Sequence, residues 1–296
     1  MMNNNFKNPI MPGADPFVLL HEGKYYMYCT IEKDTHETIT SNDGFFVYES
    51  SDLKTWTNKG LCLDKKDVMG DKWFWAPEIT YYKGKFYMVY SAEEHRGFAV
   101  SDSPLGPFKQ ENKRWLSENQ GIDGHIFIDD DGKVYFYCVR FDNGNKIVVT
   151  TMSEDLMSID EENEKLIIEA TEPWETIDCL VTEGPFVLKH NDIYYLTYSA
   201  NHTRCQDYAV GYATATNPLG PFTKYKNNPI LKKNNELVGV GHHSFTTSKD
   251  KKTLICSYHC HYNNIEFTPR MFCLNTAEFV QKENETVLVV NSPKKN

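Results

Sequence analysis

The sequence has 296 residues and a formal net charge of −10. This acidic balance argues against nucleic acid as a partner, because binding phosphates needs a basic surface. Aromatic residues make up 14% of the chain, which favours strands over a helical bundle. We find no apolar run as long as a membrane span and no signal-peptide pattern, so we expect no membrane partner and a cytoplasmic location. The oligomeric state leaves no signal in the sequence.

One short pattern recurs five times along the chain. A polar turn containing Gly, Asn or Asp is followed by an aromatic or apolar strand, a combination typical of β-hairpins. The copies begin at residues 23, 84, 132, 191 and 250, about 50 to 60 residues apart. That period holds about four short strands with their turns, which is one blade of a β-propeller.

A second strand-like segment follows each of the first four copies, at 45–56, 97–108, 147–158 and 208–222. The identical sequence PLGPF ends two of them, at 104–108 and 218–222, and predicts a fixed turn with an anchoring Phe. No composition shift or linker divides the chain. We therefore predict an all-β fold, a five-bladed β-propeller forming one catalytic domain over residues 1–296. A β-sandwich would explain the strands but not the fivefold spacing.

A polar residue stands six to nine positions before each repeat. In a propeller the strand that leads into each hairpin lines the axis, so these side chains are expected to form a ring around it. Crowded carboxylates raise one another's pKa, which keeps one protonated beside an ionised neighbour, as glycoside hydrolysis requires. The five residues are Asp15, Glu78, Asp123, Glu183 and His242.

The motifs around these residues resemble glycoside hydrolase family 43. They are ADPF at 14–17, WAPEI at 75–79, DGHIF at 123–127, TEGPF at 182–186 and GVGHHS at 239–244. The resemblance covers about residues 9 to 280 and implies a five-bladed propeller that hydrolyses glycosides with inversion. Substrates in this family are β-D-xylosides, α-L-arabinofuranosides and arabinan, with galactosides less common.

The resemblance also implies roles for three carboxylates. Asp15 is expected to be the general base that activates water, and Glu183 the general acid that protonates the leaving oxygen. Asp123 is expected to tune the pKa of the acid and to orient the sugar. An inverting pair of carboxyl groups stands roughly 6.5–9.5 Å apart, which leaves room for the attacking water.

Four further residues enter through the same resemblance. Trp75 is expected to be an aromatic wall of the sugar subsite, Arg270 to reach the sugar and the carboxylates, and Glu78 to belong to the substrate site. His242 is expected beside a calcium ion on the axis, directly or through water. His243 falls outside the motif position.

The cysteines predict free thiols rather than disulfides. Several lie inside apolar strand-like runs, as at Tyr28-Cys29 and Tyr137-Cys138, which indicates burial in a reducing compartment. In the segment CSYHCHY (256–262) two cysteines and two histidines fall on opposite faces of a strand, which makes a poor tetrahedral zinc site. The eight are Cys29, Cys62, Cys138, Cys179, Cys205, Cys256, Cys260 and Cys273.

The leading hypothesis is an inverting glycosidase that releases β-D-xylose or α-L-arabinofuranose from plant-polysaccharide-derived oligosaccharides. An endo-arabinanase is a close alternative. Retaining fructoside-cleaving propellers carry Asn-Gly after the nucleophilic Asp and Cys after the acid, whereas this chain has Asp15-Pro16 and Glu183-Gly184. A non-catalytic carbohydrate-binding propeller would lack one of the three carboxylates, and all three are present.

Overall fold

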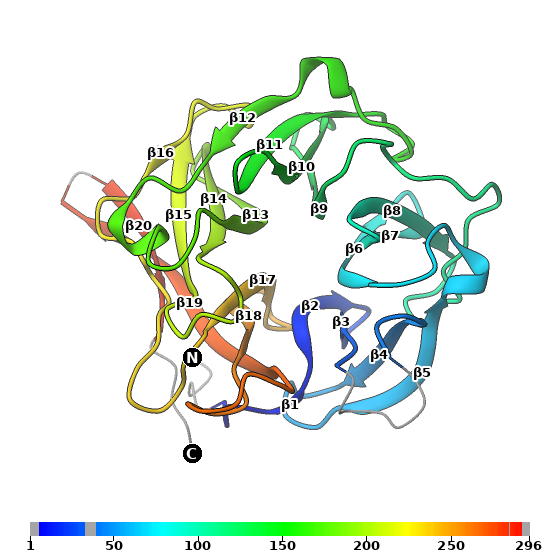
Figure 1. Ribbon diagram of the computed structural model, residues 1–296, viewed down its shortest axis with the longest axis horizontal. Coiled ribbons are helices and arrows are strands. Elements are labelled where there is room, and N and C mark those ends of the chain that lie inside the picture. The colour runs from blue at the N-terminus through cyan, green and yellow to red at the C-terminus, as the bar shows by residue number, and fades with distance from the viewer. Residues whose placement is uncertain (1–5, 33–39, 284, 292–296) are drawn as a thin grey trace.

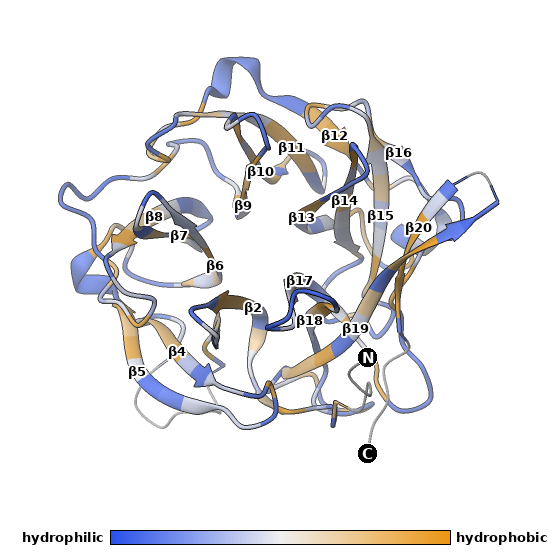
Figure 2. Ribbon diagram, turned by 180° about the vertical axis from the view of Figure 1, so that it is seen from behind, coloured by the Kyte–Doolittle hydropathy of each residue, from blue (hydrophilic) through white to orange (hydrophobic). Residues whose placement is uncertain are grey.

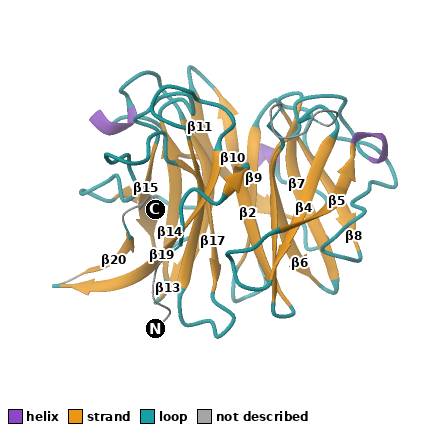
Figure 3. Ribbon diagram, turned by 90° about the horizontal axis from the view of Figure 1, so that it is seen from below, coloured by secondary structure: helices purple, strands orange, loops and turns teal. Residues whose placement is uncertain are grey.

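Five antiparallel sheets stand around a common axis in the computed structural model, which describes residues 6–32, 40–283 and 285–291. Strands β2, β6, β9, β13 and β17 lie nearest the centre, and the colour runs once around the ring from the N-terminus to the C-terminus (Figure 1). The prediction of an all-β, five-bladed β-propeller is confirmed. A side view shows strands running between two faces, with loops gathered at both (Figure 3).

The blades follow one another in chain order. Blade 1 contains β2 (Ala14–His21), β3 (Lys24–Thr30), β4 (Gly44–Ser50) and β5 (Thr57–Asp64), and blade 2 contains β6 (Trp75–Tyr82), β7 (Lys85–Ala92) and β8 (His95–Ser101). Blade 3 contains β9 (Ile122–Ile128), β10 (Val134–Phe141), β11 (Asn145–Met152) and β12 (Lys165–Ile168). Blade 4 contains β13 (Thr182–His190), β14 (Ile193–Ala200), β15 (Ala209–Ala215) and β16 (Thr223–Lys224).

Blade 5 joins the two ends of the chain. It orders β17 (Gly241–Thr247), β18 (Leu254–Cys260), β19 (Met271–Lys282) and the N-terminal β1 (Met11–Pro12), and β20 (Glu285–Val290) also pairs with β19. The buried Asn8 side chain donates to Leu274 O at 2.9 Å and accepts from Leu274 N at 2.9 Å, so it extends the ladder beyond β1. These bonds close the ring. Short 3₁₀ helices lie at Lys65–Asp67 (η2), Glu161–Asn163 (η3) and Pro173–Glu175 (η4).

The recurrent aromatic segments form the second strand of every blade: β3, β7, β10, β14 and β18. They read as continuous apolar runs because both sheet faces are covered. In β3, Tyr25 and Met27 pack with Ile255 and Phe272 of blade 5, and the alternate residue Tyr28 belongs to the cluster shared with blade 2. The hydrophobic residues accordingly lie within the blades, and the outer loops are hydrophilic (Figure 2).

The two PLGPF turns bind neighbouring blades together. The Tyr28 hydroxyl donates to Pro104 O at 2.5 Å, and the Tyr137 hydroxyl donates to Pro218 O at 2.6 Å. In the first turn Phe108 is fully buried, and its N–H donates to Cys62 O of blade 1 at 2.7 Å. The repeated sequence is thus a connector from one blade to the blade before it.

All eight cysteines are free thiols, and six of them are buried. Cys256 and Cys260 lie in the main apolar core, whereas His259 and His261 point to other partners, as the strand alternation predicted. The compartment in which the protein works stays a prediction. Within the described part of the chain, no helix has the length and hydropathy needed to cross a membrane.

Candidate active site

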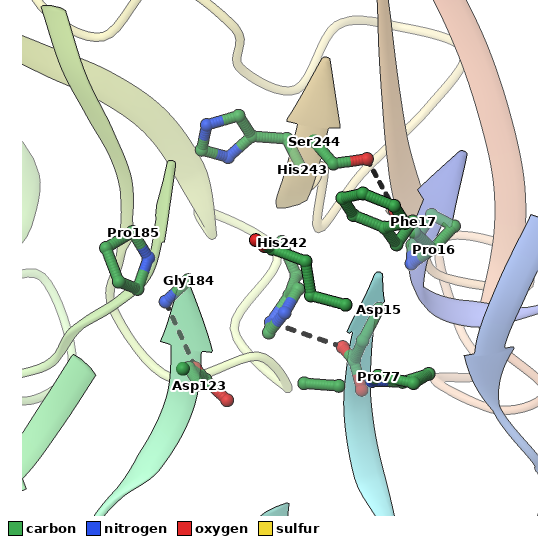
Figure 4. Close-up of a pocket in the computed structure, with 13 residues that line it drawn as sticks. Asp15, Pro16, Phe17, Pro77, Asp123, Gly184, Pro185, His242, His243 and Ser244 are labelled. Atoms are coloured by element: carbon green, nitrogen blue, oxygen red, sulfur yellow. Dashed lines mark hydrogen bonds and ion pairs between the residues drawn. The ribbon is translucent and has the colours of Figure 1, made fainter. Parts of the chain in front are cut away.

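The innermost strand of every blade carries a β-bulge at the same point. Its pairing with the second strand shifts register there in all five blades. The first residue of each bulge has a positive φ, between 45° and 56°. A bulge re-aims the local side chains, and here Asp15, Asp123 and His242 line one pocket together (Figure 4). The five bulge residues are Asp15, Ala76, Asp123, Gly184 and His242.

The expected ring of five polar residues is therefore only partly right. Asp15, Asp123 and His242 occupy equivalent bulge positions, but Glu183 stands one residue before the first residue of its bulge and Glu78 two residues after. Offsets counted from the turn hid this because the turns differ in length, with two residues between β2 and β3 but five between β9 and β10. Trp75 precedes its own bulge and thus shares the strand position of Glu183.

Each bulge amide is held by a neighbouring blade. Thr30, Ser91 and Ser199, each near the end of a second strand, accept the N–H of the next blade's bulge residue at 2.9, 3.0 and 2.8 Å. Between blades 5 and 1, His259 Nδ1 takes this place and accepts the N–H of Asp15 at 3.2 Å. These contacts preorganise the site, because residues with positive φ persist only where their surroundings hold them.

The acceptor differs between blades 3 and 4. The Gly184 N–H donates instead to the Asp123 carboxylate, whose Oδ2 lies 3.0 Å away. The Asp123 carboxyl group therefore contacts β13, the strand that carries Glu183.

Asp15 is a buried carboxylate beside an arginine. Burial alone would raise its pKa, but the Arg270 guanidinium, first among its neighbours, holds the pKa well below its usual range. Arg270 Nη1 lies 2.7 Å from Asp15 Oδ1, and the Thr30 hydroxyl donates to Oδ2 at 2.7 Å. Arg270 is itself oriented by Glu32, whose Oε1 lies 2.6 Å from Nε. Asp15 is thus ionised and fixed in place.

Glu183 and Asp123 have the opposite tendency. Burial, reinforced by the negative charge of Asp15, raises the pKa of Glu183 to about 7 despite donors on both of its oxygens. Burial and the charge of Glu183 raise the pKa of Asp123 well above its usual range. The pair therefore holds a proton near neutral pH, beside the ionised Asp15.

Glu78 lies along the axis and joins three blades. Its Oε1 accepts from His125 Nδ1 at 2.6 Å, and His125 Nε2 accepts the Val187 N–H at 3.0 Å. Because Nε2 accepts, the ring proton is on Nδ1 and points at Glu78. The structure thus gives Glu78 an inter-blade contact, and its expected part in substrate binding stays a prediction.

Trp75 is half-buried and lies against a second indole. Its ring and that of Trp73 stack at 5.9 Å between centroids with planes 10° apart, and Trp73 is 41% exposed. The outer face of the pair is not bare, since Lys72 Nζ lies 4.1 Å from the Trp73 ring. The sugar contact expected for Trp75 stays a prediction, as does the one expected for Arg270.

The two axial histidines have different environments. His242 Nδ1 lies 3.4 Å from Asp15 Oδ1, and burial lowers the pKa of the ring. His243 points away from this pair and bonds Thr197 Oγ1 at 2.6 Å (Figure 4). The motif argument preferred His242 over His243 as the residue beside a metal, and that role stays a prediction.

The side chains around His242 offer a calcium ion few direct ligands. Calcium takes roughly six to eight oxygen ligands, but the described residues contain no group of three or more His, Cys, Asp or Glu side chains that could hold a metal. The calcium ion expected beside His242, bound directly or through water, stays a prediction.

Sequence reasoning missed three side chains that contact the proposed acid or base. Tyr208 donates its hydroxyl to Glu183 Oε1 at 2.8 Å, and His259 receives the Asp15 amide. Neither stands in an inner strand or in a family motif, so no periodic signal marked them. Asn145, which donates to Glu183 Oε2 at 3.3 Å, was missed for the same reason.

Comparison with known proteins extends this picture. Residues 6–283 match glycosyl hydrolases family 43. The fold superposes with a TM-score of 0.88 on a crystal structure described as an endo-1,4-β-xylanase from Bacteroides thetaiotaomicron, at 39% identity over 98% of this chain and 97% of that one. A β-D-galactofuranosidase from Aspergillus niger is 27% identical over 98% of this chain and 86% of its own length. A β-xylosidase from Xylanibacter ruminicola is 28% identical over 71% of this chain and 77% of its own length.

The fold is a β-propeller with an ionised carboxyl group beside a proton-holding one near its axis, and its relatives are glycosidases. The protein is therefore a glycosidase. More specifically, the chain belongs to glycosyl hydrolase family 43.

Proposed function

We propose that this glycosidase releases a pentose, β-D-xylose or α-L-arabinofuranose, from plant-polysaccharide-derived oligosaccharides, with inversion at the anomeric carbon. The observation that carries the proposal is the contrast between two carboxyl groups of one site. Asp15 is held ionised by Arg270, and the pKa of Glu183 is raised to about 7. Paired carboxyls with pKa values pushed apart are the requirement for acid–base hydrolysis of a glycoside.

In the proposed reaction Glu183 gives its proton to the glycosidic oxygen as the C–O bond breaks. Asp15 takes a proton from a water molecule, whose oxygen forms the new bond to the anomeric carbon from the opposite face. At the end of the step Glu183 is ionised and Asp15 is protonated, and proton exchange with solvent restores both. Asp123, whose pKa burial and the charge of Glu183 raise, accepts the Gly184 N–H and is proposed to orient the sugar and the strand that carries the acid.

The choice of a pentose rests on the similar proteins rather than on the site. The Xylanibacter ruminicola relative is named a β-xylosidase, and the Bacteroides structure a xylanase. Stacked indoles such as Trp75 and Trp73 suit the apolar face of a sugar ring.

The test is a panel of aryl β-D-xylosides, α-L-arabinofuranosides and β-D-galactofuranosides, with proton NMR of the first product formed. We expect turnover of a pentoside with an inverted anomer. A retained anomer would exclude the proposed mechanism. Absence of turnover on all three would favour a binding role, and a preference for the galactofuranoside would replace the pentose.

Endo action on xylan is a second candidate, favoured by the name of the Bacteroides structure at 39% identity. It replaces endo-arabinanase as the stronger endo hypothesis. Products of xylohexaose distinguish the two modes. An exo enzyme releases xylose from the first minutes, whereas an endo enzyme yields xylobiose to xylotetraose first.

A further inference from the structure

The carboxyl group of Glu183 is oriented by two side chains from outside the inner strands. The Tyr208 hydroxyl donates to Oε1 at 2.8 Å, and Asn145 Nδ2 lies at a longer 3.3 Å from Oε2. Tyr208 is completely buried, so no solvent competes for this bond. Because Oε1 accepts the hydroxyl proton and the contact of Oε2 with Asn145 is the longer one, we assign the acid's own proton to Oε2.

The Tyr208 ring packs against His259 and against Gly241. One face stacks on His259 at 5.6 Å between centroids, with planes 15° apart. On another side the ring lies against the backbone of Gly241, where an added Cβ would come within 2.3 Å of Tyr208 Cε1. The glycine that precedes His242 in the inner strand is thereby explained, since only a residue without a side chain leaves room for this ring.

His259 in turn is held by β2, the strand that carries Asp15. Its Nδ1 accepts the Asp15 N–H at 3.2 Å, and its Nε2 lies 3.2 Å from Thr203 Oγ1. An accepting Nδ1 places the ring proton on Nε2, so His259 is neutral and both nitrogens are occupied. His242 continues the stack at 6.2 Å between centroids. The stacked rings of Tyr208 and His259 thus connect Glu183 at one end with Asp15 at the other.

We propose that Tyr208 is the positioning residue of the general acid, and that through His259 it sets the acid's geometry relative to Asp15. This inference rests on the proposed function, because it assigns Glu183 the role of proton donor. Tyr208 does not react itself. It holds Oε1, so that Oε2 meets the glycosidic oxygen, and misplacement of a proton donor by a fraction of an ångström slows the transfer.

The same blade offers a matched control. Tyr198 is also fully buried, and its hydroxyl donates to the buried Glu175 Oε1 at 2.6 Å. That pair lies against η4 and bonds none of the three axial carboxyl groups. Tyr198→Phe therefore removes the same kind of hydrogen bond, with a comparable effect on stability but none expected on the reaction.

The experiment compares Tyr208→Phe with Tyr198→Phe on two pentosides, one with a sugar leaving group and one with a nitrophenolate. For Tyr208→Phe we expect kcat to fall about 10- to 100-fold on the sugar leaving group. It should fall less than about threefold on the nitrophenolate, which needs little protonation. KM should stay within about threefold for both, and Tyr198→Phe should match the wild type. Thermal melting of both variants checks that they fold.

Gly241→Ala is the second variant, since its methyl group must displace the Tyr208 ring without removing the hydroxyl. It should reproduce the same selectivity for leaving groups. Unchanged kcat in Tyr208→Phe, or equal losses on both substrates, would overturn the inference. Glu183→Gln separates the proposed function from the positioning role of Tyr208. If it lacks leaving-group selectivity, the proposed function itself fails, whereas if only Tyr208→Phe lacks it, the positioning role alone fails.

Discussion

Asp15 and Arg270 meet where the ring closes: Arg270 Nη1 lies 2.7 Å from Asp15 Oδ1 although 255 positions separate them in the chain. Blade 5 supplies the arginine just before β19, and blade 1 supplies the carboxylate from β2. The pairing of β1 with β19 holds these two segments together. The strand pairing that closes the propeller therefore also brings Arg270 to Asp15, where its charge keeps the proposed base ionised.

The first prediction concerns Arg270→Met, which keeps the length of the side chain and removes its charge. Burial then dominates and raises the pKa of Asp15, which the wild type holds well below its usual range. The base works only when ionised, so activity should be lost at higher pH than in the wild type. We expect the acidic limb of kcat/KM to move up by at least about one pH unit. Arg140→Met is the control, because its ion pair with Glu164 involves none of the three axial carboxyl groups. An unmoved limb would contradict the role of Arg270.

The second prediction is the basic limb of the wild-type pH profile. Glu183 has a pKa raised to about 7, and a general acid works only when protonated. Activity on sugar leaving groups should therefore fall as the pH rises through about 7. In Glu183→Gln, the residual hydrolysis of a nitrophenyl pentoside should show no such limb. A limb that persists in this variant would assign the titration to another group.

The third prediction is a pH-dependent gain in stability from Glu183→Gln. The folded pKa is raised above the unfolded one, so the stability from a protonated Glu183 is present at low pH and is lost as the pH rises toward 7. Gln carries no charge at any pH. The melting temperature of the variant should exceed that of the wild type by roughly 2–6 °C more at pH 8 than at pH 5. The exposed Glu118→Gln should show no such trend.

The fourth prediction decides between two roles for Glu78. Glu78→Ala leaves the buried His125 Nδ1 without its acceptor at 2.6 Å, which should destabilise the fold by about 1–3 kcal/mol. Chemical denaturation measures the loss, and KM should stay within about threefold. A large rise in KM with unchanged stability would favour the substrate-binding role expected from the sequence.

The fifth prediction is insensitivity to chelation. The described side chains offer no cluster of three or more metal ligands, so a bound ion would have few protein contacts. Dialysis against EDTA should therefore leave kcat/KM within about twofold. A larger loss that calcium restores would support the ion expected beside His242.

The architecture was readable from the sequence because each blade repeats one hairpin whose strands are covered on both faces. Local patterning therefore carried the fold: the segments at 23–30, 84–91 and 132–139 became second strands as expected. The order of the five short motifs likewise pointed to the three carboxyl groups. Both signals are local, so neither required knowledge of which segments meet in space.

Other features had no local signal. Glu183 and Glu78 do not share the strand position of Asp15, Asp123 and His242, because turns of different length made spacings counted from the turn an inexact guide to strand position. Tyr208 looked like an ordinary member of a strand, and His259 had been weighed only as part of a poor zinc site.

The sequence by itself determined which residues are the candidate acids and bases, because a carboxyl group in a short motif can be recognised without coordinates. Only the tertiary structure decided which of them ionises. Charge and solvation act through space, and it is the closed ring that brings Arg270 to Asp15 and buries Glu183 beside Tyr208.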